Sequence, residues 1–400
     1  MRITYIHQHY RLPNQPGGSR PYEFSRRLAA DGHQVTMICA GAEPLDADVE
    51  GVHVKRLAVN YNNAMGFAAR VGAFLAFMAR ATVVAASERA DVVLASSTPL
   101  TVAVPGMIAA KLRRAPFVFE VRDLWPSVPV QLGLLKNPVL IRLAEALEKV
   151  TYSQAKRVIA LSPSMAEGVR QVRPDAQVMV VPNAADFERF DRTDEERAAD
   201  RREFGWGEDE LVLVYAGGFG MTYQLDWAVR LADELRRLEH PGKRIRVVLH
   251  GQGSDYQNLH RLATDLGLDA DGLLPGALSK DEVARRVAAA DAVLSPLRDD
   301  PSLAGNSLNK VFDAMAAGRP VFFNHGGWLE EAMTEGGAGW RLSRDPKEAA
   351  RRLCEIVTDP AALPEAARKA TEVGRTRFDR ETLYQDFAGE LRRAAEEQDR

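Results

Sequence analysis

Short apolar runs alternate along the chain with longer segments in which apolar residues recur at helical spacing. In the first half such runs occupy residues 3–6, 35–39, 91–97 and 117–123, and the third ends in the small polar residues Ser96 and Ser97. Runs that are apolar at almost every position are typical of strands buried on both faces of a parallel sheet. The alternation therefore predicts an α/β fold built as a doubly wound parallel sheet.

The same alternation starts again after a charged interval. Residues 186–209 are dense in Asp, Glu and Arg, and residues 211–216 then open a second series of strand-like runs. Two Rossmann-like domains that face a central cleft are the expected result. We expect an N-terminal domain over 1–190, a linker over 191–209, a C-terminal domain over 210–375, and a solvated closing helix over 376–400.

One helix in the second half has clear start and stop signals. Asn306 and Ser307 are both good N-cap residues. Gly318 suits the left-handed residue after a helix end, and Pro320 blocks continuation. A helix N-terminus presents unpaired N–H groups and a partial positive charge, so the backbone at Asn306, Ser307 and Leu308 is a predicted anion site.

Two charged residues lie on one face of this helix. Lys310 falls in the first turn and adds a full cation to the N–H donors, and Asp313 follows three residues later. This arrangement suits a nucleoside diphosphate, with its phosphates at the helix tip and its ribose hydroxyls on Asp313. The alternative is an ordinary capped helix whose Lys and Asp are solvated.

Glycine-rich turns follow several strands at the same predicted sheet edge. The glycines singled out are Gly17, Gly18, Gly218 and Gly220. Adjacent glycines let the backbone approach a phosphate closely, although a plain flexible loop has the same composition. Arg298 follows the strand 291–296 at this edge and is a second candidate cation for the leaving phosphate.

The densest polar group of the first half follows the strand at 117–121. It consists of Glu120, Arg122, Asp123 and Trp125. Polar residues at the carboxyl end of a buried strand point into the ligand crevice of a doubly wound sheet. A buried structural ion pair is the competing explanation.

The net charge of −3 conceals an asymmetry between the halves. Residues 1–190 hold 22 Lys and Arg against 16 Asp and Glu, whereas the rest holds 30 against 39. A basic first half suits an anionic partner such as a phosphorylated lipid or a membrane surface, and less so nucleic acid; chance is the alternative. The apolar helix at 64–87 is either a core helix or an interfacial one, because Arg70 and Arg80 interrupt it.

Several chemistries lack their usual signatures. The two cysteines lie far apart, which indicates a reduced, cytosolic compartment without a disulfide framework. Because the residues from Met1 onward have the pattern of a strand, we expect no signal peptide. No HExxH or spaced Cys/His cluster is found, so zinc is not expected. Asp46-Ala47-Asp48 and Asp269-Ala270-Asp271 fall away from the predicted crevice edge. We therefore expect chemistry that needs no metal.

The ordered motifs of the chain resemble glycosyltransferase family 4, and in particular its bacterial surface-polysaccharide branch. The motifs are His7-Gln8-His9-Tyr10, Gly17-Gly18-Ser19-Arg20, Gly32-His33-Gln34-Val35, Arg122-Asp123-Leu124-Trp125-Pro126, Pro182-Asn183, the stretch 309–321 and Gly326-Gly327-Trp328-Leu329. The resemblance spans essentially the whole chain. It implies a GT-B fold, a C-terminal helix that returns to the first domain, and retaining sugar transfer from a nucleotide-diphosphate sugar without metal.

The resemblance also implies roles for single residues. Donor-binding residues would be Gly17, Gly18, Gly218, Gly220, Arg298, Asn306, Ser307, Leu308, Lys310 and Asp313. Acceptor-binding residues would be Arg20, Glu120, Arg122, Asp123 and Trp125, and the catalytic group would be Lys310, Arg122 and Asp123. Within this scheme Lys310 contacts the diphosphate, and Asp313 stands where the family has a ribose-binding carboxylate.

The chain departs from the family pattern at four positions. The family often has two Glu eight residues apart, whereas this chain has Gly305 and Asp313 there. Gln224 stands near an expected Lys, and Arg122 stands where many members have a cleft histidine. Recognition of sugar hydroxyls by a glutamate and catalysis by a histidine are therefore not assumed.

We expect a hexosyltransferase or N-acetylhexosaminyltransferase that uses a UDP-sugar and no cofactor. The expected acceptor is a lipid-linked glycan at the inner membrane face, which would make the protein cytoplasmic and peripheral. A small soluble acceptor, such as an aminocyclitol, is the first alternative. A nucleotide-sugar-binding protein without transfer activity and a sugar-nucleotide epimerase are the others.

Overall fold

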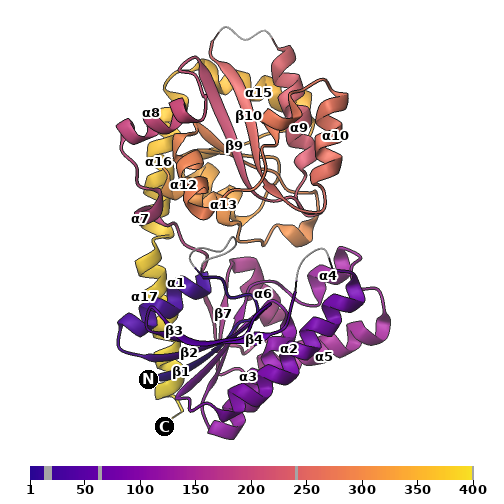
Figure 1. Ribbon diagram of the computed structural model, residues 1–400, viewed down its shortest axis with the longest axis vertical. Coiled ribbons are helices and arrows are strands. Elements are labelled where there is room, and N and C mark those ends of the chain that lie inside the picture. The colour runs from indigo at the N-terminus through magenta and orange to yellow at the C-terminus, as the bar shows by residue number, and fades with distance from the viewer. Residues whose placement is uncertain (13–19, 62–64, 239–241, 399–400) are drawn as a thin grey trace.

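We describe the protein from a computed structural model, which describes residues 1–12, 20–61, 65–238 and 242–398. Two α/β domains lie one above the other, and the last two helices run along one side of both (Figure 1). Each domain has its own mostly parallel sheet covered by helices on both faces. The prediction of two doubly wound domains is confirmed.

The sheet of the first domain has eight strands in the order β3-β4-β2-β1-β5-β6-β7-β8. The strands are β1 (Arg2–Ile6), β2 (Gln34–Gly41), β3 (Leu45–Val49), β4 (Val52–Ala58), β5 (Val92–Ser96), β6 (Phe117–Val121), β7 (Arg157–Ala160) and β8 (Val178–Val180). On the central strand β1, Ile3 pairs with Val35 on one side and Val92 on the other, both in parallel. The edge strand β3 pairs with β4 in antiparallel fashion.

The helices of this domain cover both faces of the sheet. They are α1 (Arg20–Ala30), α2 (Phe67–Ser87), η1 (Leu100–Val102), α3 (Ala103–Arg113), α4 (Ser127–Gln131), α5 (Pro138–Gln154) and α6 (Pro163–Val172). Because strands and helices alternate, every strand of the parallel part ends at the same edge of the sheet. That edge faces the second domain.

The second domain has a five-stranded parallel sheet in the order β10-β9-β11-β12-β13. Its strands are β9 (Glu210–Gly218), β10 (Arg244–Gln252), β11 (Ala292–Ser295), β12 (Val321–Phe323) and β13 (Gly339–Arg341). Its helices are α9 (Leu225–Arg237), α10 (Tyr256–Asp265), α11 (Ala270–Leu273), α12 (Lys280–Ala289), η2 (Pro301–Leu303), α13 (Asn309–Ala316), α14 (Trp328–Glu335) and α15 (Pro346–Thr358).

The segment expected to be a linker is structured and belongs to the second domain. After α7 (Phe187–Phe190) it forms α8 (Asp194–Glu203), which starts with a capping box on Thr193. Helix α8 packs against α12, where Arg285 pairs with Asp200 at 2.6 Å. The dense charges of this segment, which suggested an exposed linker, instead form ion pairs with a neighbouring helix.

The final helix returns to the first domain, as the family resemblance implied, but it is not solvated on all sides as its charges suggested. Helix α16 (Ala362–Arg377) packs on α13 of the second domain, and α17 (Arg380–Glu396) crosses back to the first. One face of α17 is buried, and its Phe387 ring lies 4.8 Å from the Phe24 ring of α1. Apolar residues spaced along an otherwise charged sequence therefore dock this helix on the first domain.

Helix α2 contributes one face to the core of the first domain and leaves most of its other residues at least partly exposed. Its buried residues form one stripe that contacts α3 and the sheet, consisting of Ala73, Phe77, Ala81 and Ala85. Its residues Ala68–Ser87 are long and apolar enough to cross a membrane by length and composition, with a mean hydropathy of 1.5, and 17% of that window is buried. Arg80 donates to the carbonyl of Ala58, so it does not stand free at the surface.

Candidate functional site

Helix α13 begins later than its sequence suggested. Its N-cap is Leu308, which offers no side-chain acceptor, so neither Asn306 nor Ser307 caps it. Its end is as expected, because Gly318 has a φ of +62°. Among the described residues, the backbone N–H groups of 307–310 find no acceptor. The tip of this helix thus retains four open donors, which is the condition for anion binding.

Lys310 projects from this tip under the turn that follows β9. Its ammonium nitrogen lies 4.2 Å from the centre of the Tyr223 ring and 4.9 Å from that of Tyr215. A Cβ at Gly217 would meet Lys310 Cε at 3.4 Å, so the side chain passes directly beside the turn. Within the described part of the chain Lys310 has neither an ion pair nor a hydrogen bond, and burial lowers its pKa to about 7.

Glycine is required where two turns of the second domain touch. A Cβ at Gly251 would lie 1.9 Å from the carbonyl oxygen of Gly217, and one at Gly253 would lie 2.3 Å from that of Phe219. Gly218 ends β9, and Gly220 accepts from the N–H of Tyr223. The close packing of these turns holds Tyr223 over Lys310. Gly17 and Gly18 lie outside the described residues.

Asp313 lies one turn below Lys310 and is half-buried. Burial, followed by the charge of Asp186, raises the pKa of this carboxyl to about 7, while Arg380, Arg189 and Lys310 oppose the rise. None of its oxygens accepts a hydrogen bond from the residues that the structure describes. The carboxyl is therefore open to hydroxyl donors such as those of a ribose.

Arg298 and Gln224 lie on the loops beside this tip. Arg298 is exposed, and its backbone N–H donates to Thr222 at 3.0 Å. Gln224 accepts at Oε1 from Arg344 at 2.9 Å and from Asn324 at 3.1 Å. Arg344 therefore brings a cation to the position where the family pattern has a lysine. Sequence reasoning missed it, because nothing in the local pattern links positions 120 residues apart.

Arg20 and Glu120 form a buried ion pair within the first domain. Arg20 Nε donates to Glu120 Oε1 at 2.9 Å, and Arg20 also donates to the carbonyl of Pro182. The other carboxylate oxygen of Glu120 accepts from Ser96 at 2.5 Å, and Glu120 is fully buried. Most of their polar atoms are thus used within the domain, whereas Arg20 Nη2 is buried without a hydrogen-bond partner among the described residues. The acceptor-binding role expected for both residues stays a prediction.

Arg122 and Asp123 remain at the cleft edge, each held by a neighbour. His7 donates through Nδ1 to the carbonyl of Ser96 at 3.0 Å, so its Nε2 accepts from Arg122 at 3.2 Å. Burial and then Arg122 hold the pKa of His7 well below its usual value, so the ring is neutral. Asp123 accepts from the Thr98 hydroxyl at 2.7 Å, and burial raises its pKa. Half-buried Trp125 follows at the same edge.

Contacts between the two domains bring these groups together. After burial, the charge of Asp123 raises the pKa of Tyr223, which places the two side chains near each other across the cleft. Asn183 donates through Nδ2 to the carbonyl of Ser307 at 2.9 Å. A Cβ at Gly305 would lie 3.1 Å from Ser164 Cβ, so a glutamate at this position would require a small shift of its neighbour in the first domain.

The Asp-x-Asp triplets lie outside this cleft, as expected. Asp46 and Asp48 contact the two nitrogens of His53 at 2.9 and 2.8 Å on the edge strands of the first sheet. Asp269 caps α11, and Asp271 pairs with His260. Neither triplet is near Lys310.

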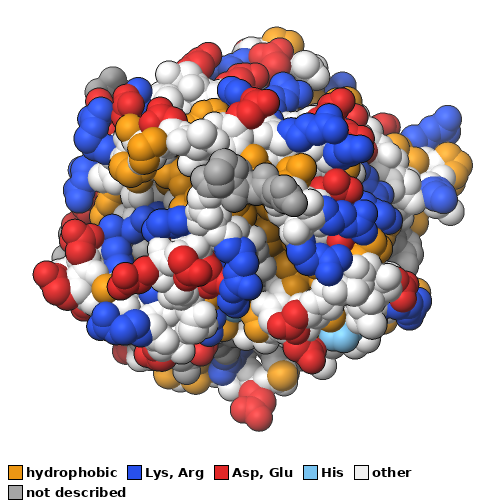
Figure 2. Space-filling view, turned by 90° about the horizontal axis from the view of Figure 1, so that it is seen from above, with side chains coloured by type: hydrophobic (Ala, Val, Ile, Leu, Met, Phe, Trp, Pro, Cys, Tyr) orange, Lys and Arg blue, Asp and Glu red, His pale blue; other side chains and the backbone are white. Residues whose placement is uncertain are grey.

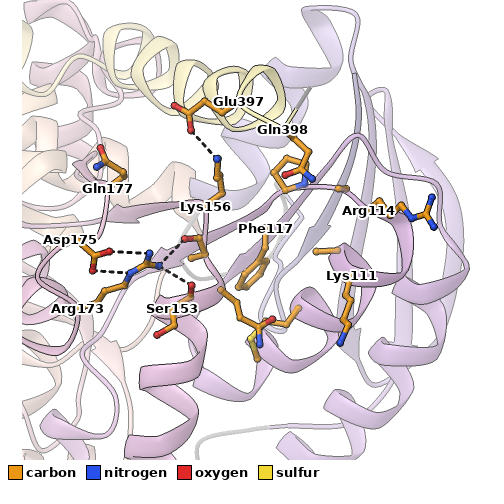
Figure 3. A pocket seen from close by; sticks show the side chains of 16 residues that line it. Lys111, Arg114, Phe117, Ser153, Lys156, Arg173, Asp175, Gln177, Glu397 and Gln398 are labelled. Atoms are coloured by element: carbon orange, nitrogen blue, oxygen red, sulfur yellow. Dashed lines mark hydrogen bonds and ion pairs between the residues drawn. The ribbon is translucent and has the colours of Figure 1, made fainter. Parts of the chain in front are cut away.

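A cavity of about 570 Å³ lies at the opposite edge of the first sheet (Figure 3). Arg173 in its wall is bonded to Asp175 and to backbone carbonyls, and Lys156 pairs with Glu397 at 3.7 Å. Lys111 and Arg114 also line it and form no ion pair with the described residues. Because the cavity lies at the sheet edge opposite the carboxyl ends of the strands, we do not take it as the functional site.

Family models match both halves of the chain. Residues 17–184 match the model of a glycosyl transferase 4-like domain, and residues 210–359 match that of glycosyl transferases group 1. D-inositol 3-phosphate glycosyltransferase from Geodermatophilus obscurus is 27% identical over 275 residues, 62% of this chain and 58% of that protein. A GDP-mannose-dependent alpha-(1-6)-phosphatidylinositol monomannoside mannosyltransferase from Mycolicibacterium smegmatis is 25% identical over 267 residues, 60% of this chain and 68% of that protein.

Solved structures share the fold over nearly the whole chain. Sucrose-phosphate synthase from Thermosynechococcus elongatus superposes with a TM-score of 0.78 at 18% identity, covering 98% of both chains. Anabaena Alr3699/HepE in complex with UDP-glucose gives 0.70 at 20% identity, covering 98% of this chain and 99% of that one. The fold is therefore GT-B. Taken with the two family matches, which together span most of the sequence, these findings show that the chain belongs to glycosyltransferase family 4.

Proposed function

We propose that this protein transfers a sugar, with retention of configuration, from a UDP-sugar to a hydroxyl group of a lipid-linked glycan. The observation that carries the proposal is the position of Lys310: a buried lysine without an ion pair, at a helix tip with open N–H donors, in a cleft between two Rossmann-like domains. A pyrophosphate supplies the negative charge that this arrangement lacks.

In the proposed reaction the acceptor hydroxyl attacks the anomeric carbon on the face from which the diphosphate leaves. The bond from this carbon to the phosphate oxygen breaks, the new glycosidic bond forms, and the hydroxyl proton passes to the departing phosphate. Lys310 and the N–H groups of 307–310 stabilise the charge that develops on the leaving group, without a metal ion. Arg344 adds a cation at the loop edge.

The remaining residues bind and orient the two substrates. Asp313 accepts hydrogen bonds from ribose hydroxyls, and the turn at Gly218 and Gly220 lets the donor approach the backbone. Arg122, held by the neutral ring of His7, and Asp123 face the acceptor side. These assignments rest on the positions of the residues around one cleft.

The nucleotide sugars named for related proteins support UDP as the donor nucleotide, and binding measurements test the choice of base. The Anabaena structure contains UDP-glucose, whereas the Mycolicibacterium relative depends on GDP-mannose. Thermal-shift measurements with UDP, GDP, ADP and dTDP would test the base directly, because a ligand that binds the native state raises Tm. We expect UDP to stabilise the wild type and an exposed-site control, Lys347→Met, but not Lys310→Met.

Product analysis then tests the transfer itself. We expect slow release of UDP from UDP-sugars in water and faster release when a polyprenyl-diphosphate sugar is added. Selective UDP binding with no release under either condition would overturn the proposal in favour of a nucleotide-sugar-binding protein without transfer activity.

A small soluble acceptor is the second candidate. It is favoured by the Geodermatophilus relative, whose name gives inositol 3-phosphate as acceptor. The two are separated by comparing UDP release with inositol phosphates and with lipid-linked sugars. The lipid-linked acceptor implies a cytoplasmic protein that is peripheral on the inner membrane face, a location that fractionation would test.

A further inference from the structure

Exposed large apolar side chains are concentrated on one group of helices of the first domain. Among the described residues they are Leu75 and Val83 on α2, Ile108 and Leu112 on α3, Leu134 before α5, Val139, Leu140, Leu143 and Val150 on α5, and Met221 in the second domain. Helices α2, α3 and α5 are neighbours in the fold. By contrast, basic and acidic side chains are interspersed at the outer end of the second domain (Figure 2).

Helix α5 carries apolar residues on both of its faces. Its inner face is buried through Thr151 and Tyr152. On the outer face, Val139 and Leu143, 63% and 61% exposed, lie one turn apart, with Leu140 beside them. The helix of a soluble domain needs only one apolar face, and the outer set has no covering partner among the residues that the structure describes.

Cations border this outer apolar face. They are Lys136, Arg142 and Lys149, all of them exposed. None of the three forms an ion pair or a hydrogen bond with the residues that the structure describes. Glu145 is the exposed acid of the same helix. An apolar stripe flanked by unpaired Lys and Arg matches the interface of an anionic bilayer, where apolar side chains enter the acyl region and cations meet phosphates.

This face begins beside the cleft. Helix α4 follows Trp125 directly and contacts η2 of the second domain, and the segment from α4 leads into the start of α5 at Pro138. Asn137 caps α5 and accepts from the N–H of Val139 at 2.9 Å. The apolar residues at the start of α5 are therefore held in a fixed place on the acceptor side of the cleft.

We propose that the outer face of α5, with Leu134 and Lys136, docks on an anionic lipid bilayer. Helix α5 lies in the interface, which brings the cleft edge at Asp123 to the membrane surface. The inference rests on the proposed function in that the acceptor is lipid-linked, and it names the surface that brings the enzyme to that acceptor. The alternative contact through Arg70 and Arg80 on α2 stays a separate prediction, which the α5 variants below distinguish from docking through α5.

Vesicle flotation tests the surface without any need for turnover. We expect wild-type protein to float with vesicles of phosphatidylethanolamine and phosphatidylglycerol, and less with phosphatidylcholine alone or at high salt. The triple variant Val139→Ser/Leu140→Ser/Leu143→Ser should reduce the partition coefficient at least about tenfold. The charge variant Lys136→Glu/Arg142→Glu/Lys149→Glu should reduce flotation with anionic vesicles more than flotation with phosphatidylcholine vesicles. Met221→Ser, at an exposed apolar site of the second domain, serves as the matched control and should float like the wild type.

Three outcomes would overturn the docking proposal. They are absence of wild-type flotation, flotation of the α5 variants equal to that of the wild type, and a shift from dimer to monomer in the Ser variant, which would make the face a contact between two copies. UDP-induced stabilisation is measured on the same samples. If UDP still stabilises an α5 variant that no longer floats, donor binding does not depend on docking. If UDP fails to stabilise a wild-type protein that floats, the proposed function is wrong while the docking proposal stands.

Discussion

The ammonium nitrogen of Lys310 lies 4.2 Å from the centre of the Tyr223 ring and 4.9 Å from the centre of the Tyr215 ring. The two rings come from β9 and from the turn after it, whereas the lysine comes from α13. Aromatic faces attract a cation without neutralising it. The lysine is thus held in position while its charge stays available for an anionic ligand.

Replacement of Lys310 should affect turnover far more than folding. We expect Lys310→Met to lower kcat/KM by about 10²–10³-fold, as is typical when one donor to a developing oxyanion is removed. Methionine packs well between aromatic rings, so Tm should change little. Steady-state kinetics with thermal melting would measure both. Tyr223→Phe keeps the ring and is the control; a collapse of activity in that variant would mean that the hydroxyl, not the ring, matters.

The roles of Asp313 and Lys310 should be distinguishable by which ligands bind more weakly when each residue is replaced. Asp313→Ala removes a predicted ribose contact, so uridine, UMP and UDP should all bind about 10-fold more weakly. Lys310→Met should weaken UDP far more than uridine, which has no phosphate. Isothermal titration calorimetry with the three ligands gives both patterns. Equal losses for all ligands in the Lys310 variant would contradict its assignment to the diphosphate.

Binding of UDP should take up a proton. Burial sets the pKa of Lys310 in the free protein at about 7, so at pH 8 the lysine is mostly neutral. A bound diphosphate favours the ammonium form and raises this pKa, so affinity should be greatest below pH 7 and fall as the pH rises above it. Calorimetry in buffers of different ionisation enthalpy reports the uptake.

Two variants show which group takes up that proton. The pKa of Asp313 is also raised to about 7, so Asp313→Asn removes the second group that titrates in this range. Uptake at pH 8 should remain in Asp313→Asn and disappear in Lys310→Met. The reverse pattern would show that the carboxyl carries the effect.

The buried pair of Arg20 and Glu120 should support the fold of the first domain. Arg20→Met leaves the fully buried Glu120 carboxylate without its guanidinium, which should cost about 3–5 kcal/mol in the free energy of unfolding. Urea denaturation measures this. Arg2→Ala, which breaks the exposed Arg2–Asp91 pair, is the matched control and should have a much smaller effect. Equal losses would argue against the structural role.

A glutamate at position 305 should separate the two domains. The Cβ alone would stand 3.1 Å from Ser164 Cβ of the first domain, so a longer side chain at this position pushes the two domains apart unless the loop itself shifts. We expect Gly305→Glu to increase the radius of gyration in small-angle X-ray scattering and to lower activity. Adding Ser164→Gly to this variant should bring the radius of gyration and the activity part of the way back to their wild-type values. An unchanged radius would mean that the loop at 304–308 yields instead.

Most of the expected architecture follows from local patterns. The apolar runs located the strands of both sheets, and Gly318 marked the end of α13, because burial of a strand and a left-handed helix end each need particular residues at adjacent positions. Lys310 and Asp313 share a face because helical periodicity places residues three apart together. The sequence predicts too early a start for α13, because Asn306 and Ser307 are good capping residues, whereas in the structure Ser307 Oγ accepts from the N–H of Asn183 and Leu308 is the N-cap.

Only the folded chain decides which distant residues meet. The Arg20–Glu120 pair, the bond from Arg344 to Gln224 and the ring of Tyr223 over Lys310 all join residues on separate elements, and no local spacing specifies them. Likewise, periodicity shows that α2 and α5 have apolar faces, but packing determines which face is covered. The sequence by itself thus determines the βα order and the donor helix with its lysine, because these depend on neighbouring residues. The tertiary structure decides the composition of the cleft and the exposed face of α5, because these depend on how the elements pack against one another.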